Sequence, residues 1–441
     1  MSLLYCLIIE LYRILYQIIY MKYLIYSLLL IVLVFSGCTT QQVYTTEKKE
    51  FTIQIQNKEE NKSIYSNPLP ITLNRFAFNL YQKINAGSRN IFISPYSISS
   101  ALSLAYFGAK ENTANQFSTV LAWDQDILVF GKNFHSLNEK IITDSLGNKD
   151  IFRVANAIWV QKNIPLQANY LNDIRKYLDS EANSFDFTSD PEKCRETINK
   201  WVEVKTNHKI MNFIPNGIIK PATRMVLTNA VYFNAVWDKS FDPKKTEMAD
   251  FFTSPGKNIS VPFMNDYTNS YKFYEDIYIK ALEIPYSGEK YSALFILPVN
   301  NGGFLKAWDY MEVDSFESLL KSMHYARVDV TIPKFKISSF FSLTEILRKM
   351  GLNEAFSPDA DFSGMTGTPD LYFDEAIHKT FVEVSEEGTE AAAATGIFMR
   401  VTSVPPSSIK KFVANHPFLF IIKENTSQTI LFMGQVFNPG E

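Results

Sequence analysis

Residues 68–441 form one uninterrupted stretch of globular character, and this stretch most constrains what the chain can fold into. It is about 370 residues long and contains no internal repeat and no second linker. A single core rarely grows so large, but one domain of this size is feasible when several sheets share the core. We therefore predict one domain over residues 68–441.

Helix and strand signals are mixed along this stretch, without the βαβ alternation that is typical of a parallel sheet. Apolar and polar residues alternate over 328–332, as in a half-buried strand. Ser342 and Glu345 have the spacing of a capping box, which predicts a helix that ends at Gly351. These signals predict an α+β fold. Four apolar runs predict further strands, the last two as a C-terminal hairpin: 281–285, 291–297, 418–422 and 430–433.

Charge and motif content exclude several classes of function. The formal net charge is −3, which provides no broad basic surface for nucleic acid. The three cysteines, Cys6, Cys38 and Cys194, lack metal-ligand spacing and cannot all pair, and the five histidines are scattered. The sequence contains no HExxH, GxGxxG or P-loop motif. We expect no metal, no cofactor and no nucleic-acid partner.

The N-terminal segment has the features of a secretory signal. From Met21 the sequence MKYLIYSLLLIVLVFSGC has one lysine, an apolar run and small residues before Cys38. Residues 35–38 resemble a bacterial lipobox, in which the cysteine is lipidated and becomes the mature N-terminus. We expect a signal peptide over residues 1–37 and an exported, membrane-anchored lipoprotein, periplasmic or at the cell surface. An uncleaved transmembrane anchor and a plain secretory signal with a free Cys38 are the alternatives.

Two further expectations concern this N-terminal region. Residues 1–20 are apolar but carry one glutamate and one arginine, and they could be an over-extended start with Met21 as the true initiator. N-terminal sequencing of the protein would decide this. Residues 39–66 are polar and lack the apolar content needed to pack, so residues 38–67 are expected to form a lipidated cysteine and a flexible tether.

The most unusual segment is the run EEGTEAAAAT at residues 386–395, which follows an apolar strand at 381–384. Its four consecutive alanines favour a short helix by propensity. Residues 396–406, however, are apolar and end in Pro405 and Pro406, which forbid helix and favour exposed, extended backbone. Because a protease needs an exposed, extended segment in its cleft, this region could serve as bait for a protease.

Residues 386–395 resemble, position by position, the hinge of inhibitory members of the serpin family. The resemblance implies an α+β serpin fold with three β-sheets, eight or nine helices and an exposed reactive-centre loop. One departure is Ala235, where the family usually has a glycine two residues before the tryptophan that corresponds to Trp237. Further segments resemble the family in order between about Leu73 and Pro439: 90–98, 228–233, 374–378, 382–388, 416–418 and 432–434.

The resemblance implies a suicide-substrate inhibitor and not an enzyme. A serine endopeptidase, or a cysteine endopeptidase, would attack the loop and form an acyl-enzyme. The cleaved loop would then insert as a strand into the central sheet and trap the protease, which is the expected partner of a monomeric inhibitor. A non-inhibitory serpin acting as a carrier or chaperone is the nearest alternative. A hydrolase that uses Ser97 and His378 is a more distant one, since no GxSxG motif supports it.

Insertion as a strand accounts for the residue types of the hinge, because side chains alternate between the two faces of a strand. One face is small and uncharged, whereas Glu390 lies on the other, where its carboxylate would avoid costly burial. The small face consists of Thr389, Ala391, Ala393 and Thr395. The whole predicted hinge consists of Glu386, Glu387, Gly388, Thr389, Glu390, Ala391, Ala392, Ala393, Ala394 and Thr395.

The family's spacing places the bait bond fourteen positions after the hinge glycine, which implies Thr402–Ser403. Val401 and Thr402 would suit proteases with small or medium specificity pockets, of elastase or subtilisin type. Arg400–Val401 is the alternative bait for a trypsin-like protease, although cleavage there would shorten the inserted strand by two residues, roughly 7 Å. Phe398 and Met399 offer chymotrypsin-like bonds closer to the hinge.

A last set of residues matches positions where the family controls the opening of the central sheet. Trp237 is similar to a tryptophan at the point where the loop enters the sheet. The other four match a hydrogen-bonded cluster beneath the sheet, whose bonds must rearrange when a strand enters: Ser94, Ser97, Asn229 and His378.

Overall fold

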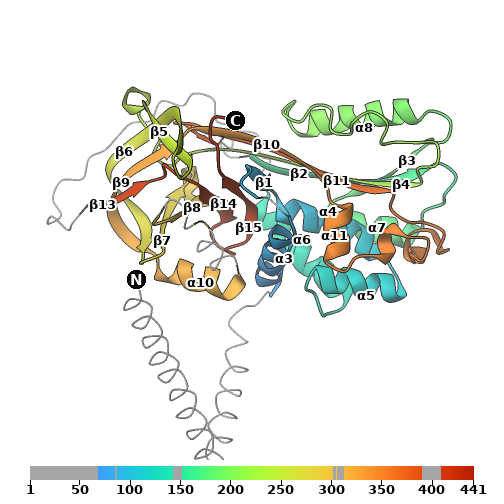
Figure 1. Ribbon diagram of the computed structural model, residues 1–441. Coiled ribbons are helices and arrows are strands. Elements are labelled where there is room, and N and C mark those ends of the chain that lie inside the picture. Colours follow the sequence, from blue (N-terminus) through green and yellow to red (C-terminus); the bar gives the residue numbers. More distant parts are fainter. Residues whose placement is uncertain (1–67, 85–86, 143–150, 301–303, 305–311, 390–408) are drawn as a thin grey trace, which may run out of the picture. The chain divides into compact units, whose positions relative to one another are not determined.

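The structure is a computed structural model that describes residues 68–84, 87–142, 151–300, 304, 312–389 and 409–441. The described residues belong to one compact unit, Asn67–Glu441. Within the described ranges, no helix has both the length and the apolar character needed to cross a membrane. Two sheets and nine α-helices make up this part of the chain, in agreement with the predicted α+β class (Figure 1).

The first sheet has six strands in the order β10-β11-β12-β4-β2-β3. Its centre is β4, in which nearly every residue is buried because helices cover both faces of the sheet. The strands are β2 (Ile151–Gln161), β3 (Glu181–Phe185), β4 (Met225–Val236), β10 (Phe335–Ser342), β11 (Glu375–Val384) and β12 (Gly388–Thr389).

The boundary between β4 and β11, which we call the seam, differs at its two ends. At its closed end the strands pair directly in parallel, Glu375 to Lys379 against Val226 to Ala230. At its open end β12 lies between them and pairs antiparallel with both. Between the two ends no pairing of described residues joins β4 to β11. The sheet therefore holds the beginning of an additional strand at one end only.

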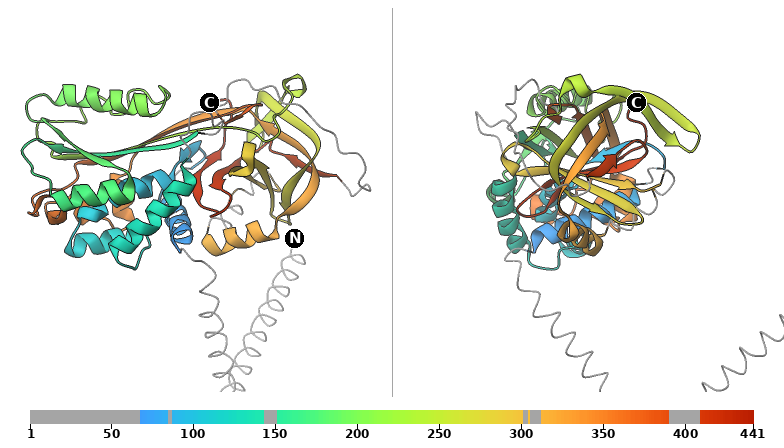
Figure 2. Two further views of the ribbon diagram at one scale, coloured as in Figure 1. Left: turned by 180° about the vertical axis from the view of Figure 1, so that it is seen from behind. Right: turned by 90° about the vertical axis from the view of Figure 1, so that its left-hand side faces the viewer.

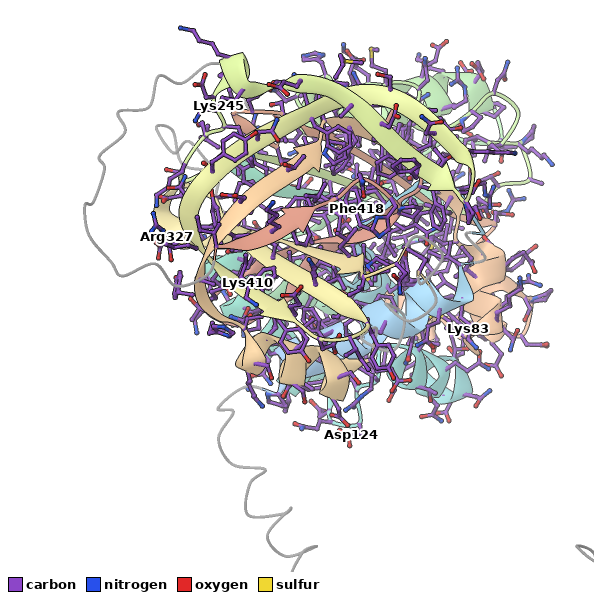
Figure 3. The ribbon with its side chains drawn as sticks, turned by 60° about the vertical axis from the view of Figure 1, so that its left-hand side comes forward. Lys83, Asp124, Lys245, Arg327, Lys410 and Phe418 are labelled. Atoms are coloured by element: carbon purple, nitrogen blue, oxygen red, sulfur yellow. The ribbon has the colours of Figure 1, made fainter. Side chains whose placement is uncertain are left out.

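The second sheet has nine strands in the order β1-β15-β14-β8-β7-β6-β9-β13, with β5 paired to β6. Phe418, at the start of β14, is fully buried within it (Figure 3). The strands are β1 (Ile91–Ile93), β5 (Glu247–Ser254), β6 (Lys257–Glu275), β7 (Ile279–Pro285), β8 (Tyr291–Pro298), β9 (His324–Pro333), β13 (Lys410–Val413), β14 (Phe418–Glu424) and β15 (Ile430–Val436).

The described strands thus join into two sheets, where three were expected. The reason is that β6 and β9 are long and stay paired along most of their length. A bulge between Asp266 and Asn269 shifts the register and bends the pair. The portion that carries β5 and β13 is therefore continuous with the rest through β6 and β9, instead of forming a separate sheet.

Helices cover both faces of the six-stranded sheet (Figures 1 and 2). On one face, α4 is buried almost throughout, and the hydroxyls of Ser99 and Ser103 donate to carbonyls of its own backbone, so they can lie in the core. On the other face, α8 packs through Ile198 and Val202 onto Trp159. The α-helices are α3 (Leu69–Lys83), α4 (Pro95–Gly108), α5 (Glu111–Val120), α6 (Ile127–Ile141), α7 (Ala168–Leu178), α8 (Pro191–Lys205), α10 (Val313–Ser322), α11 (Thr344–Lys349) and α12 (Ser363–Thr366).

Most of the local predictions agree with the observed elements. The predicted strands at 328–332, 281–285 and 291–297 lie in β9, β7 and β8, and the C-terminal hairpin is the antiparallel pair β14 and β15. The helix after Ser342 is α11, and Gly351 follows it with a positive φ of 111°. The capping box, however, was wrong. The Ser342 hydroxyl donates to the carboxylate of Glu375 on the neighbouring strand β11, so that it is not available to cap α11.

Candidate functional site

Gly388, the hinge glycine, lies so close to β4 that no other residue fits its position. A Cβ atom on this residue would lie 2.1 Å from the carbonyl oxygen of Ala235, and its φ is +154°. A tight turn leads to it from β11, because the N–H of Ser385 donates to the Gly388 carbonyl over 2.9 Å. The glycine therefore allows the chain to turn back and enter the seam.

Trp237 lies at the open end of the seam and contacts the turn that precedes β12. Its indole N–H donates to the Ser385 carbonyl over 2.9 Å, and its backbone N–H donates to the Glu387 carbonyl over 2.9 Å. The ring is 2% exposed and stacks on Tyr286, with ring centroids 4.5 Å apart and planes 9° apart. Trp237 thus holds the turn that precedes β12 with both its backbone and its side chain.

Glu386 fixes the same turn through charge. Its carboxylate pairs with Lys334 over 2.7 Å and accepts a hydrogen bond from the Thr246 hydroxyl over 2.7 Å. Burial raises the pKa of Glu386, but the bonds from Lys334, Thr246 and its own backbone N–H outweigh this effect and lower the pKa below its ordinary value. Sequence reasoning did not find Lys334 or Thr246, because both come from segments far from the hinge.

Four of the predicted cluster residues meet beneath the closed end of the seam. His378 Nε2 accepts from the backbone N–H of Ser94 over 3.1 Å, and its Nδ1 lies 2.6 Å from the Asn229 side-chain oxygen. The Asn229 amide in turn donates to the Ser97 carbonyl over 2.7 Å and to its hydroxyl over 2.5 Å. It also donates to the side-chain oxygen of Asn156 over 2.5 Å. Asn156 is thus a further member of the cluster, which sequence reasoning missed.

These contacts keep His378 neutral. The ring is fully buried, and since Nε2 accepts a hydrogen bond, the proton lies on Nδ1 and is donated to Asn229. Burial lowers the pKa of His378 from 6.5 to about 3. Because both ring nitrogens are already bonded, and the Ser97 hydroxyl is bonded to Asn229, Ser97 and His378 do not have the geometry of a nucleophile and its base.

The cluster lies where the sheet starts to open. His378 and Asn229 are opposite each other in the register, and the next pair, Lys379 with Ala230, is the last before the strands part. A strand that entered from the open end would have to separate His378 from Asn229. The cluster is therefore the barrier to full opening of the seam.

The remaining predicted residues divide between the described and the undescribed parts of the chain. Thr389 is described and is 1% exposed, so it faces the interior as the alternation predicts. The rest of the hinge (390–395), both bait bonds (Arg400–Val401 and Thr402–Ser403) and Cys38 lie outside the described residues. Among the described residues, no group of histidine, cysteine and acidic side chains is arranged to hold a metal ion.

The sequence model of one family, described as "Serpin (serine protease inhibitor)", matches residues 72–439. The chain belongs to the serpin family. This match spans the six-stranded sheet, the seam and the hinge, so that the resemblance seen in the sequence is confirmed.

Relatives and solved structures agree with this assignment. The serpin is 38% identical to Serpin B3 of Homo sapiens over 83% of this chain and 98% of that protein. It is 35% identical to Intracellular coagulation inhibitor 2 of Tachypleus tridentatus over 83% of this chain and 90% of that protein. Its fold matches human thyroxine-binding globulin in complex with thyroxine, with a TM-score of 0.77 and 30% identity over 85% of this chain and 99% of that chain.

His378 should make the stability of this serpin dependent on pH. Its pKa is lower in the folded protein (about 3) than in the unfolded chain (about 6.5), so the stability it contributes is present above pH 6.5 and is lost as the pH falls towards 3. Between pH 7 and pH 5 this loss should reach about 2 kcal/mol. Denaturant titrations of the parent and His378→Gln should differ in pH dependence by this amount, and equal pH dependence would contradict the assignment.

The ion pair of Glu386 should contribute measurably to the open end of the seam. Glu386→Gln removes the charge that Lys334 neutralises, and we expect it to lower the free energy of unfolding by roughly 1–2 kcal/mol. Glu383→Gln is the matched control, because Glu383 is more exposed and lies 3.8 Å from Lys336. The control should change stability by no more than about 0.5 kcal/mol. Equal effects of the two substitutions in urea unfolding would refute a special role for Glu386.

Proposed function

We propose that this serpin is a suicide-substrate inhibitor of serine endopeptidases, with cysteine endopeptidases as a second class of target. The observation that carries the proposal is β12, a two-residue strand that begins an insertion between β4 and β11. Where the hinge enters the seam, it consists of the small residues Gly388 and Thr389. Beyond them the seam is closed by hydrogen bonds of His378 and Asn229, which an entering strand could replace. These features support a loop that inserts after cleavage.

The proposed reaction begins as ordinary proteolysis. The protease nucleophile attacks the carbonyl carbon of the bait residue and the peptide bond breaks. An ester to a serine protease, or a thioester to a cysteine protease, forms, and the new amino group leaves with the proton that the nucleophile has lost. The freed end of the hinge then extends β12 along the seam and pairs with both neighbouring strands. If insertion precedes attack by water, the ester persists and the protease is carried along the sheet and distorted.

The register of β12 supports the Thr402–Ser403 bond as bait. If this register continued along β4, the first residue of that strand, Met225, would face Met399. Cleavage at Thr402–Ser403 would leave three residues beyond the end of the sheet to carry the protease. The protease could then remain attached without blocking the last pairs of the inserted strand.

The other bonds are less suitable by the same argument. Cleavage at Arg400–Val401 would leave a single residue beyond the sheet, so we expect a trypsin-like protease to cut there with less efficient trapping. Cleavage next to Phe398 would hold the protease against the sheet before insertion is complete. Proteases of elastase or subtilisin type, which accept Thr402, are therefore the proposed targets.

A carrier role is the second candidate, and the similarity to thyroxine-binding globulin with its bound thyroxine favours it. The two functions differ in one measurable outcome. We would incubate the protein lacking residues 1–38 with an elastase, a subtilisin and a trypsin, and analyse the mixtures on denaturing gels. A complex that survives SDS, with a released fragment that begins at Ser403, is the expected result. Cleavage by all three without such a complex would contradict inhibition and leave the carrier role.

We further propose that the protein is exported and anchored by a lipid on Cys38. The support is the sequence of residues 21–38, with its lysine, apolar run and small residues before the cysteine. Expression in a bacterial host with a labelled fatty acid should label the parent and not Cys38→Ser. Equal labelling of the two proteins, or none of either, would contradict the anchor.

Thr389→Arg should convert the inhibitor into a substrate. Thr389 is buried, and an arginine there would place an unpaired charge in the core, so that the hinge would not stay in the seam. Since each 1.4 kcal/mol added to the insertion barrier slows insertion about tenfold, we expect the number of inhibitor molecules consumed per protease to rise at least about tenfold. Thr389→Ser, which keeps the hydroxyl, is the control. Efficient trapping by the arginine variant would show that insertion does not pass through this position.

A further inference from the structure

Tyr286 makes a contact between the two sheets that has no part in the reaction steps proposed above. It follows β7 in the nine-stranded sheet, and its hydroxyl lies 2.6 Å from the hydroxyl of Thr389 in β12. Both side chains are buried: Tyr286 is 0% exposed and Thr389 is 1% exposed. The contact therefore joins the hinge of one sheet to the body of the other.

The position of Tyr286 is fixed independently of the hinge. Its ring stacks on Trp237 and meets Phe233 edge to face, with centroids 5.2 Å apart. Its backbone forms an isolated bridge with Trp237, and its N–H donates to the Tyr291 carbonyl over 3.0 Å. The contacts with Trp237 and Phe233 thus fix the phenol hydroxyl at the inner side of the seam.

Burial of Thr389 depends on this hydroxyl. A buried hydroxyl that loses its partner is strongly disfavoured relative to one in water. With Tyr286 in place, Thr389 can satisfy its hydroxyl inside the protein, and β12 can remain paired with both neighbours. Without Tyr286, the same hydroxyl would favour a hinge that leaves the seam.

The contact also defines the register of insertion. Thr389 faces Tyr286 when Gly388 is opposite Val236, as observed. A slip by one residue would exchange the two faces of the strand and direct Glu390 towards the core. The observed register, unlike this slipped one, gives the Tyr286 hydroxyl a hydroxyl partner.

We propose that Tyr286 is a positioning residue that holds the hinge in the seam and sets the register of insertion, and thereby the balance between trapping and simple cleavage. The effect on trapping rests on the proposed inhibitory function. The effect on the hinge does not, because it exists before any protease binds. The two parts can therefore be tested separately.

Hydrogen exchange followed by mass spectrometry tests the first part on the protein without protease. In Tyr286→Phe, the amides of Gly388 and Thr389 should exchange about tenfold faster, because the hinge leaves the seam more often. Thr389→Val removes the same bond from the other side and should also speed exchange. The double variant replaces both hydroxyls by apolar groups, so that neither hydroxyl is left without the other, and its exchange should return towards the parent rate.

A buried tyrosine elsewhere provides the control. Tyr170 donates to the Leu104 carbonyl over 3.0 Å on the opposite side of the sheet from α8, and Tyr170→Phe should leave exchange at the hinge unchanged. Unchanged exchange in Tyr286→Phe, or a double variant that exchanges faster than both single variants, would overturn the role in docking.

The second part is measured as the number of inhibitor molecules consumed per protease. This number should rise several-fold in Tyr286→Phe and fall back in the double variant. If the parent protein forms no SDS-stable complex with any protease, the proposed function fails, and the effect on trapping fails with it. If the parent traps protease and Tyr286→Phe traps equally well, the proposed function stands and this inference is refuted.

Discussion

The direct pairing of β4 with β11 at the closed end of the seam is the constraint on which the rest of the structure depends. Parallel neighbours there are satisfied, and the buried His378–Asn229 contact reinforces them from below. A few residues further on, the same two strands part and hold β12 between them. The sheet is thus complete at one end and one strand short at the other. It can accept an additional strand along its full length only if the closed end opens.

The two ends of the seam have complementary chemistry. The open end is held by contacts to the hinge: the Gly388 backbone, the Trp237 stack and the Glu386–Lys334 ion pair. The closed end is held by neutral hydrogen bonds that an entering strand could replace one by one. Ten further residues, 390–399, would fit along β4 in the observed register. Insertion would pair these residues with both β4 and β11, at the cost of the direct pairs between Glu375–Lys379 and Val226–Ala230.

Local patterns such as alternation and turn residues located most of the strands, whereas the hinge and the cluster beneath the sheet were predicted from the resemblance to serpins. Sequence reasoning failed where distant residues compete. Glu375 takes the hydroxyl of Ser342 that local spacing had assigned to a helix cap. Likewise, no local pattern marks Lys334 or Tyr286, because their contacts with Glu386 and Thr389 form only in the folded protein. The described strands join into two sheets where three were expected, because β6 and β9 stay paired along most of their length, which the residue pattern does not show.

The claim that the seam accepts the cleaved loop is tested most directly by comparing the thermal unfolding of the intact protein with that of protein cut once in the loop. Cleavage normally loosens a protein, but insertion would add a strand to the centre of the sheet. We predict that the cut protein unfolds at least about 10 °C above the intact one, because the inserted strand would add backbone pairs on both of its sides. An unfolding temperature equal to or below that of the intact protein would contradict insertion.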